Sequence, residues 1–214
     1  IKKEYKNVKH YIEHPGVYLV GKEDPIPFFF IDEKMIKDLF KIKSFQKIET
    51  KIQTSQKTIT KKTKKIISII SKNKESFFVG KNVLGYIEGS DSKLKNELIV
   101  ITAHYDHIGI IDGLIHNGAD DNATGTAAVM EIAEAFMIAK KEGKGPRRSV
   151  LIMPVSGEEK GLLGSKYYTD NPVYPLDKTI ANLNIDMIGR IGDFKDDPNY
   201  VYLIGSDMLS KELH

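Results

Sequence analysis

The sequence predicts an α/β fold in which an open, mostly parallel mixed sheet carries helices on both faces. Three apolar runs, at residues 97–103, 149–156 and 179–187, are separated by segments with helical spacing. Continuous apolar runs of this length are typical of strands that are covered on both faces in a parallel sheet. Their alternation with helical segments indicates successive β-α-β units.

Length and composition limit the possibilities further. The 214 residues suffice for one α/β domain with a buried core, or for one domain and part of another. The absence of cysteine excludes disulfides and thiolate metal sites. No apolar run approaches the roughly 18 residues of a membrane span, and no signal peptide opens the chain. Because the sequence starts with Ile1, we expect the true N-terminus to lie upstream.

Charge is distributed unevenly along the chain. Residues 1–75 carry 18 lysines and 9 acidic groups, a balance of +9, whereas residues 76–214 carry 14 basic and 20 acidic groups, a balance of −6. The basic part contains no arginine, and its lysines alternate with Ile, Thr and Ser. We therefore expect a solvated lysine-rich surface and no nucleic-acid partner.

Residues 1–75 are predicted to be part of a small β-rich domain with a linker. The two prolines in residues 24–32 allow at most an edge strand there. Residues 33–40 have helical spacing. Residues 45–70 show a strand-like pattern of Ile among Lys and Thr.

Residues 76–214 are predicted to form the α/β unit that contains the sheet. Its helices are expected at residues 126–140, within residues 157–168 and at the end of the chain. Its strands are expected at residues 82–90, 97–103, 149–156, 179–187 and 199–206.

Histidine and aspartate are dense in the glycine-punctuated loop within residues 103–126. Imidazole and carboxylate are the ligands that a divalent cation such as zinc accepts. The sequence therefore predicts a metal site that begins in this loop. The polar residues concerned are His104, Asp106, His107, His116, Asp120 and Asp121.

Two further apolar runs also end in candidate ligands. Glu158 and Glu159 follow the run at 149–156, and Asp186 ends the run at 179–187. Because ligands bind beyond the carboxyl ends of parallel strands, we expect these carboxylates to meet His104 at one edge of the sheet.

Chemistry suggests a role for each group. We expect His104 to bind a metal, Asp106 to accept its other ring proton, and either Asp120 or Asp121 to bridge two cations. Asp186 would complete one metal site and Glu159 the other. Glu158 would accept a proton from the attacking water and pass it to the leaving amine.

Four motifs now carry a resemblance: HYDH, GADDNATGT, SGEEKGLLGS and NIDMIGR. Together, over residues 82 to about 206, they resemble the co-catalytic di-zinc aminopeptidases of the bacterial leucyl aminopeptidase and aminopeptidase Y type. Relatives of these enzymes include glutamate carboxypeptidase and glutaminyl cyclase. The resemblance implies a phosphorylase/hydrolase-like zinc-peptidase fold, two Zn²⁺ ions and an extracytoplasmic location, either secreted or periplasmic.

The resemblance also implies the site residues. It selects Asp120 over Asp121 as the bridging ligand, and it makes Glu158 the general acid/base with Asp106 as the support of His104. The zinc ligands that it implies are His104, Asp120, Glu159 and Asp186.

One departure from the family pattern concerns the second zinc. The family takes its last ligand from a His well downstream of the NIDM motif, whereas the only later His here is His214. We therefore expect a chain truncated before that ligand, which binds the second ion weakly and turns over poorly. Residues 1–75 resemble, more weakly, the end of a protease-associated domain.

The resulting expectation is a zinc-dependent exopeptidase that removes N-terminal residues from peptides with a free N-terminus. The alternatives on the same scaffold are a carboxypeptidase, a dipeptidase or a glutaminyl cyclase. A catalytically silent binding domain is a further alternative, although such a relative would have no need of Glu158. Of the other polar residues, we expect His107 to make a structural hydrogen bond, Asp121 and Asn122 to cap the following helix, and Arg190 to pair with an acid.

Overall fold

The computed structural model describes residues 16–20, 31, 33–60, 62–68, 76–191 and 200–209. The chain divides into two compact units, one of residues 22–77 and one of residues 1–21 and 78–214. Within the described residues no helix is both long enough and apolar enough to cross a membrane. The assignment of residues 1–75 to a protease-associated-like insert stays a prediction.

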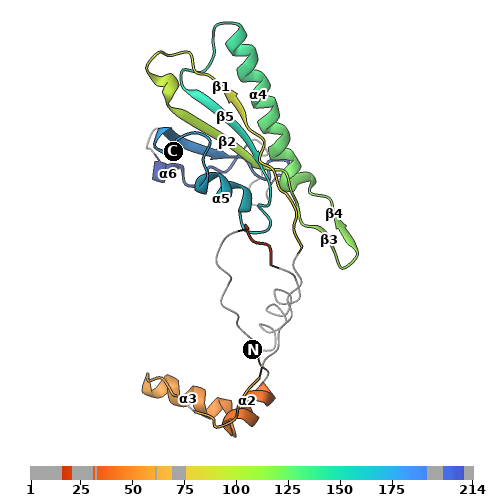
Figure 1. The fold of residues 1–214 in the computed structure, drawn as a ribbon, viewed down its shortest axis with the longest axis vertical. Helices are drawn as coiled ribbons and strands as arrows, with labels where there is room; N and C mark the ends of the chain where they lie inside the picture. The colour runs from red at the N-terminus through yellow and green to blue at the C-terminus, as the bar shows by residue number, and fades with distance from the viewer. Residues whose placement is uncertain are drawn as a thin grey trace. The chain divides into compact units, whose positions relative to one another are not determined.

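The larger unit is built on a four-stranded mixed sheet with the order β1-β5-β2-β6 (Figure 1). The central pair, β2 (Leu98–His104) and β5 (Ser149–Val155), is parallel, and β6 (Thr179–Asn184) runs parallel to β2 on its other side. The short β1 (Gly85–Ile87) is antiparallel to β5 at the opposite edge. The predicted mostly parallel sheet is confirmed.

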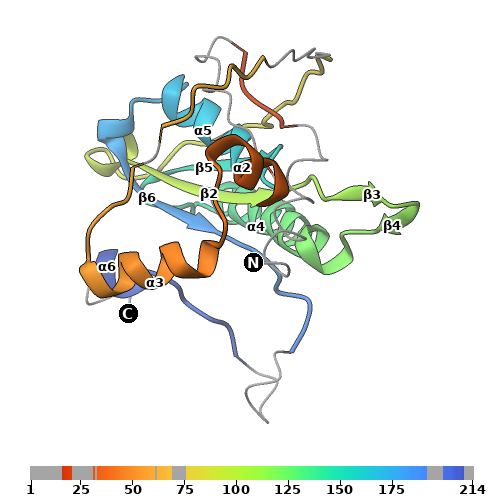
Figure 2. The same ribbon diagram turned by 90° about the horizontal axis from the view of Figure 1, so that it is seen from below.

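Helices cover both faces of this sheet, as predicted. Figure 2 shows α4 (Gly125–Lys141) on one face and α5 (Leu163–Asp170) on the other. The short helices η1 (Leu94–Asn96), η2 (Ala119–Thr124) and η3 (Leu176–Lys178) lie in the connections, and the backbone of η2 is non-helical at Asp121 and Asn122. The last described residues form α6 (Ser206–Leu209).

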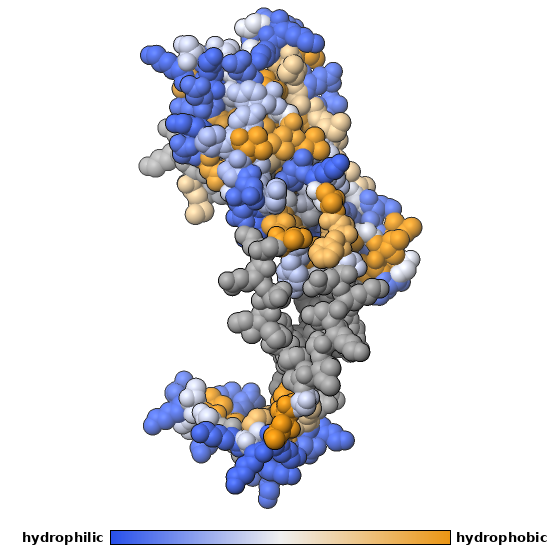
Figure 3. All heavy atoms as spheres, viewed as in Figure 1, coloured by the Kyte–Doolittle hydropathy of each residue, from blue (hydrophilic) through white to orange (hydrophobic). Residues whose placement is uncertain are grey.

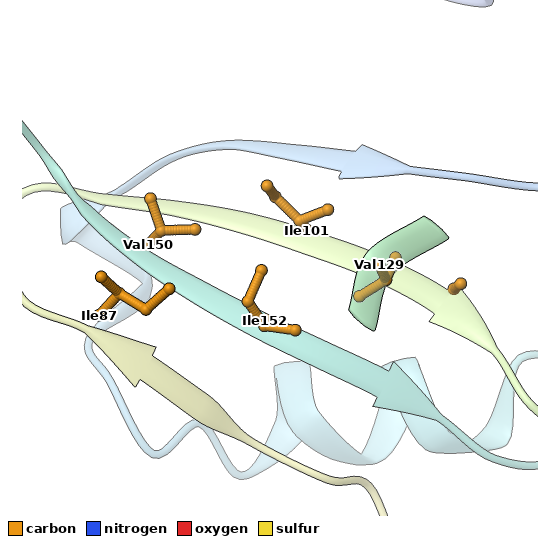
Figure 4. Packing of buried hydrophobic residues seen from close by; sticks show 6 residues of the cluster. Ile87, Ile101, Val129, Val150 and Ile152 are labelled. Carbon is orange, nitrogen blue, oxygen red and sulfur yellow. The ribbon is translucent and has the colours of Figure 1, made fainter. Parts of the chain in front are cut away.

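The two faces have separate apolar cores because side chains alternate along a strand. Toward α4, Val129 belongs to a buried cluster with Ile87, Ile101, Val150 and Ile152 (Figure 4). Toward α5 the buried cluster contains Leu98, Val100, Leu151, Met153, Val155 and Tyr168. This double burial explains why β2 and β5 read as continuous apolar runs.

The unit of residues 22–77 differs from its prediction. The helix expected at residues 33–40 is confirmed as α2 (Glu33–Phe40). The strand-like prediction for residues 45–70 is wrong over its first part, where α3 (Phe45–Ser55) forms. Ser44 caps that helix by accepting a hydrogen bond from the Lys47 N–H at 3.3 Å. Ile48 and Ile52 are four residues apart, so their spacing fits a helix as well as a strand. The described residues of this unit contain helices and no strand, so its β-rich character stays a prediction.

Two further predictions need correction. The strand expected at residues 199–206 does not form in its described part, because residues 201–204 are exposed and pair with no other strand. The loop after β2 contains a hairpin of β3 (Gly109–Ile111) and β4 (Leu114–His116) that was not predicted. Its turn uses Asp112 and Gly113 at positive φ, the combination that favours tight hairpins. The apolar surface of this hairpin is visible in Figure 3 and comes from Ile110, Leu114 and Ile115.

Leu151 offers a test of the core. Its side chain is fully buried in the cluster that contains Tyr168 of α5, so Leu151→Ala should lower the free energy of unfolding by about 2–5 kcal/mol. Leu114→Ala, at an exposed position of the hairpin, should change it by less than about 0.5 kcal/mol. Urea unfolding followed by circular dichroism measures both, and equal losses would contradict the assignment of the core.

Candidate metal centre

The carboxyl ends of three parallel strands deliver the predicted ligands to one edge of the sheet. His104 is the last residue of β2, Glu158 and Glu159 follow β5, and Asp186 follows β6. The structure brings His104 within 3.5 Å of Asp186 and within 3.9 Å of Glu158, measured from its Nε2 atom. The expected meeting of these side chains is found.

The ring of His104 is buried, and its hydrogen bonding fixes its tautomer. Nδ1 donates to the backbone carbonyl of Asp106 at 3.0 Å. A carbonyl oxygen only accepts, so Nδ1 carries the proton and the lone pair of the neutral ring is on Nε2. That lone pair faces Asp121 Oδ1 at 3.1 Å and Asp186 Oδ1 at 3.5 Å.

These distances fit a divalent cation. Two donor atoms on one tetrahedral zinc lie about 3.3–3.6 Å apart, because zinc–ligand bonds to N and O are about 2.0–2.2 Å long. His104 Nε2 is also buried without a hydrogen-bond partner among the described residues, an arrangement that a cation would relieve. His104, Asp121 and Asp186 therefore form a first ligand group.

Asp106 supports the centre differently from the prediction. Its carboxylate is 3.8 Å from His104 Nδ1 and does not accept the ring proton, which its own backbone carbonyl accepts instead. The two carboxylate oxygens accept hydrogen bonds from the backbone N–H groups of Glu158 at 3.1 Å and Glu159 at 3.3 Å. Asp106 thus positions the glutamate pair.

A second ligand group lies beside the first. His107 Nδ1 is 2.8 Å from Glu159 Oε1 and 4.0 Å from Asp121 Oδ2. Asp121 belongs to both groups, with one carboxylate oxygen toward each. The sequence analysis placed His107 in the loop of the metal site but expected only a structural hydrogen bond from it, whereas the structure sets it beside Glu159.

Asp120 does not join either group, which corrects the choice of Asp120 over Asp121. Its Oδ1 accepts a hydrogen bond from the Gly189 N–H at 2.8 Å, and its Oδ2 is 3.7 Å from Arg190 Nε. Because Asp120 and Asp121 are adjacent in the chain, their side chains leave the backbone in different directions, and only Asp121 faces His104. The expected pairing of Arg190 with an acid is confirmed.

Asn122 ties together the loops that carry the ligands. Its side chain is buried, and Oδ1 accepts from Gly125 N–H at 3.0 Å and from Met187 N–H at 3.3 Å. Its Nδ2 donates to the Ile185 carbonyl at 3.0 Å. Asn122 therefore satisfies an N–H group at the start of α4, as predicted, and holds the backbone on both sides of Asp186. Asp121, which was also expected to cap this helix, faces His104 instead.

Gly125 allows this close approach, because a Cβ there would lie 2.3 Å from Asn122 Oδ1.

The environment shifts the pKa of two groups. Burial raises the pKa of Glu158, the neighbouring His104 lowers it, and the charges of Glu159, Asp186 and Asp106 raise it again, so that the net shift is upward. For His104, burial lowers the pKa. The hydrogen bond to Asp106 and the charges of Glu158 and Asp186 outweigh that effect, and the net pKa is raised. A carboxyl group whose pKa is raised is suited to general acid–base chemistry near neutral pH.

Comparison with known proteins places this centre in a family context. The model of peptidase family M28 matches residues 82–201. A probable zinc metalloprotease of Pyrenophora teres f. teres is 35% identical over 112 residues, and a vacuolar membrane protease of Verticillium alfalfae is 30% identical over 122 residues. Aminopeptidase YwaD of Bacillus subtilis is 28% identical over 109 residues.

Each of these alignments covers 50% of the chain. It covers 22% of the Pyrenophora protein, 11% of the Verticillium protein and 22% of the Bacillus protein.

The expected secreted or periplasmic location is contradicted by these comparisons. Fungal relatives from four species are named vacuolar membrane proteases. The expectation rested on the resemblance to exported bacterial enzymes and on the weaker resemblance of residues 1–75 to a protease-associated domain.

Asn122→Ala tests whether the hydrogen bonds of Asn122 position the metal ligands. The change leaves the N–H groups of Gly125 and Met187 and the carbonyl of Ile185 without this partner, so we expect a loss of stability of about 1–3 kcal/mol. We also expect zinc affinity to fall about 10- to 100-fold, as for other residues that orient ligands. Competition with a chromophoric chelator measures the affinity. Asn171→Ala, at an exposed helix end, is the control, and equal zinc affinity in the two variants would contradict the role.

Proposed function

This chain belongs to peptidase family M28, and we propose that it contributes most of the metal ligands and the general base of a zinc-dependent aminopeptidase. The observation that carries the proposal is Asp121, which lies in both ligand groups with Glu158 beside them. Family membership confirms the resemblance drawn from the four motifs and implies peptide substrates.

The two ligand groups would hold one zinc ion each. His104, Asp121 and Asp186 would bind the first, and Asp121 and Glu159 would bind the second. When bound, such a pair of ions polarises the peptide carbonyl and lowers the pKa of a water molecule toward about 7. The relatives named zinc metalloprotease support the choice of zinc.

Glu158 is the residue that moves protons in this proposal. It lies 3.9 Å from His104 Nε2 but belongs to neither ligand group, so its carboxylate is free to face the attacking water. Asp106 fixes its backbone, and its raised pKa suits a group that accepts a proton and returns it. The proton would go to the amine that leaves when the peptide bond breaks.

The charge of the centre favours a substrate with a free N-terminus. Two zinc ions and Arg190 would balance five of the six carboxylates at this edge and leave a negative surplus. A protonated N-terminal amine complements that surplus, whereas a C-terminal carboxylate would be repelled. The relative named aminopeptidase agrees with this choice. The six carboxylates are those of Asp106, Asp120, Asp121, Glu158, Glu159 and Asp186.

Substrate comparison on the full-length protein tests the type of reaction. We expect hydrolysis of aminoacyl p-nitroanilides and of peptides with a free amine, and no hydrolysis of the same peptides after N-terminal acetylation. Release of C-terminal residues from acetylated peptides would show a carboxypeptidase instead. Cyclisation of an N-terminal glutamine would show a glutaminyl cyclase.

Glu158→Gln tests the base. The amide cannot accept the proton, so kcat should fall about 100- to 10,000-fold, while the zinc content measured by elemental analysis should not change. Glu142→Gln, at an exposed position after α4, is the matched control. Full activity of Glu158→Gln would refute the assigned base and point to another base, whereas a wild-type protein without hydrolytic activity would leave the silent binding domain as the alternative.

A further inference from the structure

We propose that His107 is a direct ligand of the second zinc ion, so that His107, Asp121 and Glu159 together form a three-ligand site. The inference rests on the proposed two-ion function and assigns it one more residue. It also replaces the expectation that this group keeps only two protein ligands.

The geometry of His107 and Glu159 indicates a cation between them. Nδ1 of His107 and Oε1 of Glu159 are 2.8 Å apart, and both atoms are buried. Neither has a hydrogen-bond partner among the described residues, because the short distance lacks the direction that a hydrogen bond needs. A buried nitrogen and a buried carboxylate oxygen without hydrogen bonds are unfavourable, and a shared cation compensates both.

The third member of the group lies at a compatible distance. Asp121 Oδ2 is 4.0 Å from His107 Nδ1. The distances of 2.8 and 4.0 Å lie on either side of the 3.3–3.6 Å or so expected between donors on one tetrahedral zinc. Small shifts of the Asp121 and Glu159 carboxylates around a bound ion would bring both distances into that range, while Asp121 Oδ1 remains next to His104 Nε2.

The position of the His107 ring is fixed from two directions. Asp106, the preceding residue, is held by the backbone N–H groups of Glu158 and Glu159. Gly118 lies against the ring, in the left-handed conformation with φ of 67°, and a Cβ there would be 2.8 Å from His107 Cβ and Cγ. The absence of a side chain at Gly118 therefore leaves the room that the His107 ring occupies.

The competing role for His107 is to orient Glu159 by a hydrogen bond without touching the metal. The two roles make different demands on residue 107. A glutamine amide can donate a hydrogen bond to Glu159, but it is a poor zinc ligand, because zinc sites use Cys, His, Asp and Glu. His107→Gln therefore separates an orienting residue from a ligand.

Metal titration of the full-length protein tests the proposal without relying on activity. The metal-free protein is titrated with Zn²⁺ by calorimetry and with Co²⁺ by absorption spectroscopy, and circular dichroism checks that each variant is folded. We expect the wild type to bind two ions. His107→Ala and His107→Gln should keep the first ion and bind the second more than about 100-fold more weakly, which exceeds the usual loss for an orienting residue.

His116→Ala is the matched control, because His116 is an exposed histidine of the same loop and belongs to neither group. It should bind both ions as the wild type does. If His107→Gln binds the second ion with wild-type affinity, His107 orients Glu159 and is not a ligand, and the inference is overturned. If His107→Ala binds both ions with wild-type affinity, His107 has no role in metal binding, and the inference is overturned as well. A wild-type protein that binds one ion would instead refute the two-ion function on which the inference rests.

Discussion

Six carboxylates converge at the carboxyl edge of one small sheet, and their mutual repulsion is the constraint that the surrounding structure must satisfy. Backbone N–H groups satisfy part of it, since Asp106 accepts from Glu158 and Glu159 and Asp120 accepts from Gly189. The remaining carboxylates face the unpartnered nitrogens of two histidines. Two imidazole rings cannot balance the charges of four carboxylates, so divalent cations are the compensation that fits.

The fold meets this constraint through a rigid sheet and a few polar contacts that join its loops. Parallel pairing of β2 with β5 and β6 places the end of each strand at the same edge. Asn122 then connects the start of α4 to the loop that carries Asp186, and Asp106 connects the β2 loop to the glutamate pair. Asn122 and Asp106, which are next to ligands in the sequence, thus position ligands that lie on neighbouring loops.

The sequence predicted the features that depend on the periodicity of apolar residues. It missed those that depend on the direction in which a loop residue points its side chain. Continuous apolar runs identified β2, β5 and β6, and strand ends located His104, Glu158, Glu159 and Asp186. No period separates Asp120 from Asp121, because a change of backbone direction at one loop residue decides which carboxylate faces His104. The strand expected after residue 199 did not form in its described part, because an apolar pattern becomes a strand only beside a partner.

The central claim is that Asp121 joins two metal sites, and a crystal structure of the full-length protein with zinc tests it most directly. Anomalous scattering at the zinc absorption edge locates each ion independently of the protein atoms. The account predicts two peaks about 3.5–4 Å apart, one beside each carboxylate oxygen of Asp121. A single peak, or two peaks that contact Asp120 while Asp121 faces solvent, would contradict it.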